Sequence, residues 1–244
     1  MADMSLLYQG LAQYCIEHPR QVKNSGGFMR WGDNSRYWAK DIGEGFIYGD
    51  YVEGISESIF TKQPSALTPE EIKKRRALIE KERQQAKQKQ IKLWQERAQK
   101  AAKIWQSSQV FTGQHSYLSK KQVLPYGLRL SETNNYLVLP LRDTNGKIWS
   151  LQTISETGEK RFLSGGRVKG CYFAIGKPDK EIVICEGYAT GASIHQATGK
   201  AVAVAFNKEN LESVVEALKN KYPALGLILS LIHISEPTRQ AEIS

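Results

Sequence analysis

The chain has 244 residues, with 34 Lys and Arg against 25 Asp and Glu, and its formal net charge is +9. This length accommodates one large domain or two small ones. The excess of positive charge indicates a polyanionic partner, with nucleic acid as the first candidate, although a basic surface can also serve only to keep a protein dissolved.

The cysteines and the N-terminal residues bear on the compartment. Cys15, Cys171 and Cys185 are widely spaced and form no Cys-x-x-Cys or Cys/His cluster. This spacing excludes a recognisable zinc site and suits a reducing environment. Residues 1–19 lack the basic region of a signal peptide, and no apolar run is long enough to cross a bilayer. We therefore expect a cytoplasmic protein with no membrane partner.

Residues 1–66 predict a small α+β module. Apolar residues recur at helical spacing between Leu6 and Cys15, and three short aromatic-rich runs follow at 26–32, 36–39 and 45–51. Such runs between Gly and Asn/Asp turns are typical of an antiparallel meander. Its aromatic residues either stack the bases of a template or fill the interior of the sheet, and we favour the interior, because a small domain needs bulky residues there. These residues are Trp31, Tyr37, Trp38, Phe46 and Tyr48.

Residues 67–106 predict one long basic helix. Thr68 is a typical N-cap, Pro69 suits the first helical position, and Glu70 and Glu71 suit the first turn. Lys, Arg, Gln, Glu and Ala dominate the rest of the segment, and neither Gly nor Pro interrupts it. Apolar positions are too sparse for a heptad seam, so we expect a mostly solvated helix that joins two domains. It is either a cationic rod for a phosphate backbone or a spacer without a partner.

Residues 107–179 predict a β-rich subdomain with hairpins. Strands are expected at 136–141, 148–154 and 160–163, with turns at 143–146 and 156–158. The last strand leads into a loop in which cations surround a Gly pair. Since Gly permits close backbone approach and Arg and Lys neutralise phosphate, this loop indicates a phosphate contact. The alternative is a solvated hairpin end. The candidate residues are Lys160, Arg161, Gly165, Gly166, Arg167 and Lys169.

Residues 180–228 predict a β-α-β-α-β unit. The apolar run Ile182–Cys185 is short and β-branched, as in a buried strand of a parallel sheet, and it ends at Glu186 and Gly187. Helical pattern follows at 193–198 and 208–220, and strands at 201–206 and 225–229. Ligands of such sheets bind at the carboxyl ends of the strands, where a carboxylate can hold a divalent cation or move a proton. By spacing alone, a strand corner without function fits equally well.

The stretch ICEGYATGASIHQATGKAVAVAF, Ile184–Phe206, resembles the first half of the topoisomerase-primase (Toprim) domain of plasmid- and phage-encoded DNA primases and primase-helicases. The resemblance implies that Glu186 is catalytic and contributes to binding Mg²⁺, with Gly187 at the nucleotide site. In that family an Asp-x-Asp pair follows a later strand and binds magnesium. Here the pair is absent after 225–229, so a lone Glu186 should bind Mg²⁺ weakly.

Two further regions resemble parts of the same primases. Residues 140–146 (Pro-Leu-Arg-Asp, then Gly) and Gly165-Gly166-Arg167 match the β-rich subdomain that precedes the Toprim fold. The run at 26–31, a Tyr-Trp strand and a Gly-Asp-Tyr match the N-terminal module more loosely. Asn207 and Asn210, after the strand at 201–206, are candidates to line the site.

The last residues differ from the family. Residues 229–240, LSLIHISEPTRQ, followed by AEIS, look like a translated sequencing adapter, and we expect 229–244 to be a foreign tail. The alternative is a natural tail without the acids. The expected chain is therefore a primase fragment that is truncated inside the Toprim domain and inactive by itself.

The resulting prediction is an α+β and α/β protein with five segments. They are an N-terminal module (1–66), a basic helical linker (67–106), a β-rich primase-core subdomain (107–179), a partial Toprim domain (180–228) and a non-native tail (229–244). The resemblance implies RNA primer synthesis by metal-dependent nucleotidyl transfer in plasmid or phage replication. The implied partners are single-stranded DNA, nucleoside triphosphates and a replicative helicase. The alternatives are another Toprim enzyme, of nuclease or topoisomerase type, and a non-catalytic single-stranded DNA-binding accessory protein.

Overall fold

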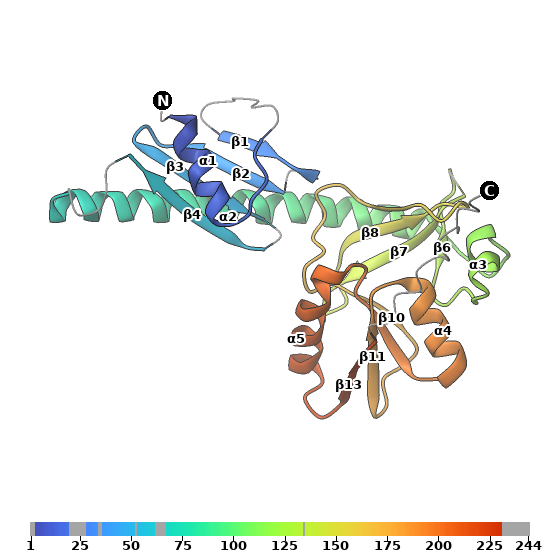
Figure 1. Cartoon of the computed structure of the whole chain (residues 1–244). Coiled ribbons are helices and arrows are strands. Elements are labelled where there is room, and N and C mark those ends of the chain that lie inside the picture. Colours follow the sequence, from blue (N-terminus) through green and yellow to red (C-terminus); the bar gives the residue numbers. More distant parts are fainter. Residues whose placement is uncertain are drawn as a thin grey trace, which may run out of the picture. The chain divides into compact units, whose positions relative to one another are not determined.

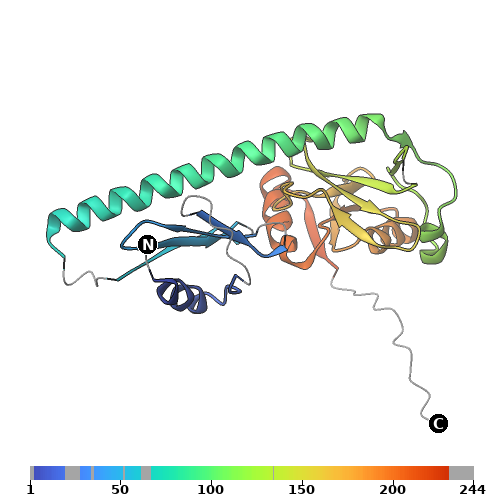
Figure 2. The same ribbon diagram turned by 90° about the horizontal axis from the view of Figure 1, so that it is seen from above.

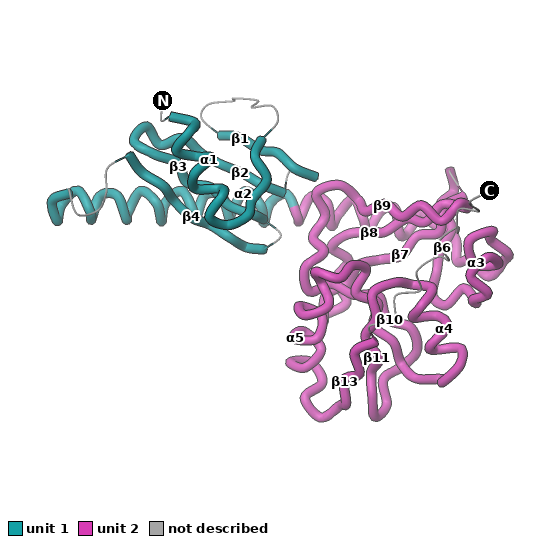
Figure 3. The backbone as a smooth tube through the Cα atoms, viewed as in Figure 1, with its two compact units in different colours: residues 1–93 teal, residues 94–244 magenta. Residues whose placement is uncertain are grey.

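The computed structural model describes residues 3–19, 28–33, 36–51, 53–61, 67–133 and 135–230. The chain combines helices with β-sheets, as the sequence predicts. It contains two compact units, Met1–Leu93 and Trp94–Ser244 (Figure 3), and helix α2 (Pro69–Ser107) contributes to both. Within the part that the structure describes, no helix is both long enough and apolar enough to cross a membrane.

Unit 1 is built on a four-stranded antiparallel sheet in the order β1-β2-β3-β4 (Figure 1). Its strands are β1 (Phe28–Trp31), β2 (Tyr37–Asp41), β3 (Gly45–Asp50) and β4 (Ile55–Phe60). Helix α1 (Met4–Gln13) lies on one side of this sheet and α2 on the other (Figure 2). Strands β1, β2 and β3 are those of the predicted meander, whereas β4 was not predicted.

The aromatic residues of unit 1 form its two cores. Trp31, Phe46 and Tyr48 pack with Leu7 and Leu11 of α1, whereas Trp38 and Ile47 pack with Ala86 of α2. This alternation follows from the two faces of a strand. Trp31, Trp38, Phe46 and Tyr48 are each at most 8% exposed, and Tyr37 is partly buried. These residues therefore fill the interior and do not form an open platform for bases.

Helix α2 begins where the sequence predicts. The Thr68 hydroxyl accepts from the Glu71 backbone N–H, and the Glu71 carboxylate accepts from the Thr68 backbone N–H at 2.8 Å, which is a capping box. Yet the expectation of a mostly solvated helix is wrong for its inner face in unit 1. There Lys40 pairs with Glu82 at 2.5 Å, and Arg75 pairs with Glu44 at 3.1 Å. These ion pairs flank a small apolar contact of Ala86 and Ile79 with the sheet, and so few apolar residues give no clear periodicity.

Unit 2 contains a five-stranded antiparallel sheet in the order β5-β6-β7-β8-β9. Two short strands, β5 (Gln109–Val110) and β6 (Arg129–Leu130), flank α3 (Ser116–Lys121) in the chain. The predicted hairpins follow as β7 (Leu137–Arg142), β8 (Ile148–Ile154) and β9 (Lys160–Phe162). Ala101 of α2 packs on Val138 and Leu151 of this sheet.

The second sheet of unit 2 has the order β10-β12-β11-β13. Strands β11 (Glu181–Cys185), β12 (Ala201–Val204) and β13 (Gly226–Leu229) run parallel, as expected, and β10 (Phe173–Ile175), which was not expected, pairs antiparallel with β12. Helix α4 (Tyr188–Thr198) packs on one face, whereas the short turn η3 (Lys208–Asn210) and α5 (Leu211–Lys221) adjoin the other (Figure 1). Helix α4 begins five residues before its predicted start.

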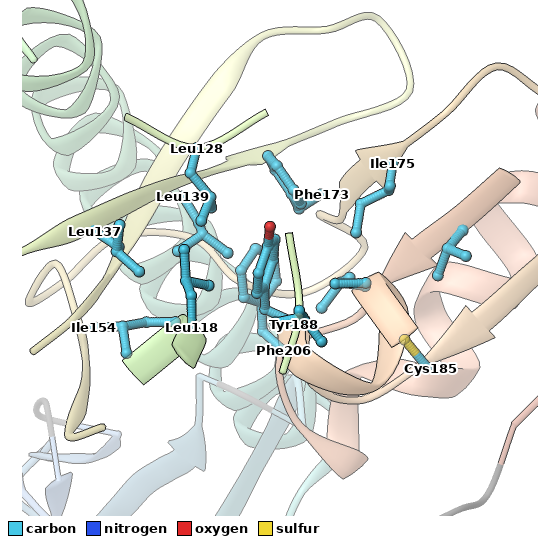
Figure 4. Packing of buried hydrophobic residues seen from close by; sticks show 14 of the residues in the cluster. Leu118, Leu128, Leu137, Leu139, Ile154, Phe173, Ile175, Cys185, Tyr188 and Phe206 are labelled. Carbon is cyan, nitrogen blue, oxygen red and sulfur yellow. The ribbon is translucent and has the colours of Figure 1, made fainter. Parts of the chain in front are cut away.

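One core joins the two sheets of unit 2. Leu137 and Leu139 of β7 pack in the same cluster as Phe173 of β10 and Tyr188 of α4 (Figure 4). The Tyr188 hydroxyl donates to the backbone oxygen of Leu124 at 3.1 Å. This shared core holds the β8–β9 region against the carboxyl end of β11.

The expected foreign tail lies mostly outside the described residues, which end at Ser230. Leu229 still pairs with Ile184 in β13, and the Ser230 N–H donates to the Ile184 oxygen at 2.8 Å.

Candidate active site

Glu186 directly follows β11, at the carboxyl end of the parallel strands. Its backbone is fixed by the neighbouring strand, because its oxygen accepts from the Phe206 N–H and the Cys185 oxygen accepts from the Ala205 N–H, both at 2.8 Å. The residue is half-buried. The carboxylate therefore starts from a rigid strand end, where ligands of open α/β sheets bind.

Gly187 forms the corner between β11 and α4. It is the N-cap of α4, and its oxygen accepts from the Gly191 N–H at 3.0 Å. A Cβ added at Gly187 would have the Lys160 Nζ at 3.8 Å as its near contact. Lys160 comes from β9, so the shared core brings a cation of the predicted loop to the strand end that carries Glu186.

The pKa of Lys160 depends on its burial and on the charges of Lys121 and Glu186. Burial lowers its pKa, nearby Lys121 of α3 lowers it further, and Glu186 opposes the shift. The charges of Lys121 and Glu186 thus both act on Lys160 beside this corner. Cations of this kind neutralise phosphate oxygens, and a carboxylate can accept a proton from a hydroxyl.

Replacing Glu186 with Gln is expected to lower the Lys160 pKa further, because the substitution removes the negative charge that favours the ammonium form. NMR titration of the lysine side-chain carbons measures this shift. Glu181→Gln, at the opposite end of β11, is the control and should leave the Lys160 pKa unchanged. An equal Lys160 pKa in both variants would show that the charge of Glu186 does not act on Lys160.

The other predicted loop residues make different contacts. Arg161 pairs with Glu159 at 2.8 Å, and Arg167 lies over the Trp149 ring at 4.9 Å. Lys169 is exposed, and its backbone oxygen accepts from Arg167 Nε at 3.1 Å. Gly165 has a φ of +73°, which favours glycine, and Gly166 lies against buried Ser150. The structure therefore brings Lys160 and Gly187 to Glu186, whereas Arg161 and Arg167 turn to other partners.

A group of cations and tryptophans in unit 2 was missed by sequence reasoning. Arg129 and Arg142 lie over Trp105 at 4.4 and 5.7 Å, and Lys147 lies over Trp149 at 3.8 Å. Burial and then Arg129 lower the Arg142 pKa. Positive charges that lie close together in this way favour the binding of an anion. The signal available in the sequence was the alternation of basic residues and Trp around the β7–β8 hairpin.

Asn210, proposed from the sequence to line the site, instead anchors the loop that carries the cations around Gly165 and Gly166. We call this segment the basic loop. The Asn210 side-chain carbonyl accepts from the Gly170 N–H, and its amide group donates to the oxygens of Cys171 and Ala205, all at 2.8 Å. The side chain is buried. Asn210 thus ties the end of the loop to the end of β12.

Asn210→Ala is expected to destabilise unit 2 by about 3 kcal/mol, because it leaves buried backbone groups without partners. Urea unfolding followed by circular dichroism measures the change. Asn145→Ala in the exposed β7–β8 turn is the control, with a change within about 0.5 kcal/mol. A similar small change for Asn210→Ala would show that the loop does not depend on this anchor.

The described residues do not fit the magnesium site that the resemblance implies. Among them, no three His, Cys, Asp or Glu side chains group so that they could hold a metal ion. Mg²⁺ requires octahedral oxygen ligation and commonly uses more than one carboxylate. Glu186 supplies one, which is insufficient for a magnesium site of that kind.

No protein family model matches the chain. Two curated Escherichia coli proteins, each described as "DNA primase TraC", are similar to it. One is 34% identical over 123 residues, which is 48% of this chain and 11% of the relative. The other is 39% identical over 97 residues, which is 38% of this chain and 7% of the relative. The chain thus spans about a tenth or less of these relatives, and the matches support a relation to DNA primases.

Proposed function

We propose that this chain belongs to the catalytic region of a Toprim-type DNA primase that synthesises RNA primers on single-stranded DNA. The observation that carries the proposal is Glu186 at the end of a parallel strand, with Lys160 over the adjacent Gly187, in a chain similar to DNA primase TraC. The parallel order of β12, β11 and β13, with helices on both faces, also supports a Toprim fold.

The chemistry is nucleotidyl transfer. A primer 3′-hydroxyl attacks the α-phosphorus of a nucleoside triphosphate, a new P–O bond forms, the α–β P–O bond breaks, and pyrophosphate leaves. Such transfer requires mainly positioning and charge neutralisation. In this proposal Lys160 and Lys121 neutralise phosphate oxygens and Glu186 accepts the proton of the attacking hydroxyl; their mutual electrostatic influence supports these roles.

The template would lie along the cations of the β7–β8 hairpin and the basic loop. Arg129, Arg142, Lys147 and Arg167 are held over tryptophan rings. Backbone contacts of this kind are independent of sequence and salt-sensitive. This basic region also favours a second candidate, a single-stranded DNA-binding protein without catalysis, because one carboxylate does not make a metal site.

A hybrid enzyme separates the two candidates. The segment of E. coli DNA primase TraC that matches this chain is replaced with the corresponding residues of the chain, and primer synthesis is measured on single-stranded DNA with magnesium. Synthesis above that of a hybrid with a scrambled segment supports the primase. A folded hybrid that binds DNA without synthesis supports the binding protein. The 244-residue chain alone is expected to show no synthesis.

A further inference from the structure

Helix α2 carries most of the net positive charge of the chain. It has twelve Lys and Arg against five Glu, a net +7, while the whole chain has +9. Its charges are sorted by their position on the helix. In unit 1, Glu82 pairs inward with Lys40, and Glu71 belongs to the N-terminal cap. Glu82 is therefore engaged on the inner face of the helix, and Glu71 at its first turn.

After the capping turn, one side of α2 in unit 1 carries only Lys and Gln at its exposed positions. Lys74, Lys81, Gln85, Lys89 and Lys92 recur at intervals of seven, four, four and three residues, which places them on one side of the helix. All five are exposed. Within the described part of the chain, none of the four lysines forms an ion pair. We name these five residues the lysine stripe.

The edge strand β1 adds a further cation beside the stripe. Arg30 lies over the rings of Phe28 and Tyr51, at 5.4 and 5.1 Å, and donates to the Tyr51 hydroxyl at 3.2 Å. Lys89 of the stripe lies over the same Phe28 ring at 5.8 Å. Phe28 and Tyr51 thus hold two cations near each other, and neither is paired with a carboxylate of the described residues.

We propose that the lysine stripe and Arg30 form a second nucleic-acid contact, in unit 1, that binds the phosphate backbone of single-stranded DNA. A row of unpaired cations along a rigid helix complements a chain of phosphates. An anionic membrane fits less well, because a surface-bound helix needs an exposed apolar face, whereas that of α2 packs on the sheet. The contact goes beyond the proposed catalysis, since it needs neither Glu186 nor nucleotides.

Fluorescence anisotropy of the whole chain with a labelled oligo(dT) of about 30 nucleotides tests the contact across a salt series. The variant carries Lys74→Gln, Lys81→Gln, Lys89→Gln and Lys92→Gln. The slope of log affinity against log salt should decrease in magnitude by about 3, because each lost contact with a single strand contributes about 0.7. At about 0.1 M salt, binding should weaken by roughly tenfold or more.

The control has a comparable loss of charge elsewhere. Lys177→Gln, Lys180→Gln and Lys219→Gln change exposed residues of unit 2 and should leave the slope nearly unchanged. Replacing the four stripe lysines with Arg should retain binding, and Arg30→Gln should lower the slope by about 0.7. Circular dichroism verifies folding. If the fourfold Gln variant unfolds, the single variants decide, each with an expected slope change of about 0.7.

Two results would overturn the proposal. One is an unchanged salt slope of oligo(dT) binding in the folded Gln variants. The other is that the Gln variants lose binding to anionic vesicles but still bind oligo(dT) as the unmodified chain does. The contact is measured as the oligo(dT) affinity of the chain alone, whereas catalysis is measured as primer synthesis by the hybrid enzyme. Failure of catalysis in the hybrid enzyme and failure of this contact are therefore separate outcomes.

Discussion

Glu186→Gln in the hybrid primase is expected to reduce primer synthesis by a factor of roughly 10² to 10⁴, the usual contribution of a positioned general base. Gln keeps the shape of the side chain but cannot accept a proton. Because the backbone of Glu186 is held by Phe206, the fold should persist. The measurement is the initial rate of labelled ribonucleotide incorporation on single-stranded DNA.

Glu181→Gln is the matched control on the same strand. Glu181 lies at the other end of β11 and pairs with Lys200 at 2.6 Å, and both side chains are more than 40% exposed. Loss of such a surface pair costs little, so synthesis should remain within about twofold. Equal rates for the two variants would remove Glu186 from catalysis, whereas equal losses would indicate general damage to the sheet.

Gly166→Ala is expected to destabilise unit 2 by about 3 kcal/mol, at the upper end of the usual cost of overpacking. A Cβ at this position would lie 2.2 Å from the Ser150 Oγ and 2.7 Å from the Ser150 Cβ. Ser150 is fully buried in β8 and cannot move aside. Urea unfolding measures the loss, and a parallel decrease in oligo(dT) affinity is expected if the loop binds the template.

Two further variants isolate this clash. Gly187→Ala places its Cβ no closer than 3.8 Å to Lys160 Nζ and should change stability by less than about 1 kcal/mol. Ser150→Gly removes the two nearest atoms that the new methyl group meets and leaves the Leu163 oxygen at 3.1 Å, so Gly166→Ala should cost less in that background. If the two substitutions act additively, the clash is not the cause.

The local sequence was sufficient for the secondary structure of most segments. The capping box at Thr68, the Gly turns of the hairpins and the β-branched run before Glu186 each predict their element, because a few neighbouring residues satisfy the local backbone geometry. The strand β10 was missed, since three residues carry too little pattern. The start of α4 was also missed, because its first residues are small and resemble a turn.

The candidate site divides in the same way. The sequence alone proposed Glu186, Gly187 and the basic loop as candidates, because strand ends and Gly-rich turns have local signatures. It did not separate Lys160 from Arg161, since adjacent strand residues point to opposite faces and only packing decides which face meets the corner. The sequence analysis also assigned Asn210 to the lining of the site. The side chain of Asn210 instead bonds the backbone of Gly170 and Cys171, which are distant in the chain, and of Ala205 at the end of the preceding strand.

The sequence by itself determined the order of elements, the excess of positive charge and the carboxylate at the strand end, because these are properties of composition and of neighbouring residues. Only the tertiary structure decided which charges are paired and which remain available. Glu82 pairs with Lys40 on the inner face of α2, while Lys74, Lys81 and Lys92 are exposed. Lys160 lies near Gly187 because the core of unit 2 packs their two segments together. Such pairings depend on contacts between segments far apart in the chain, which local pattern does not encode.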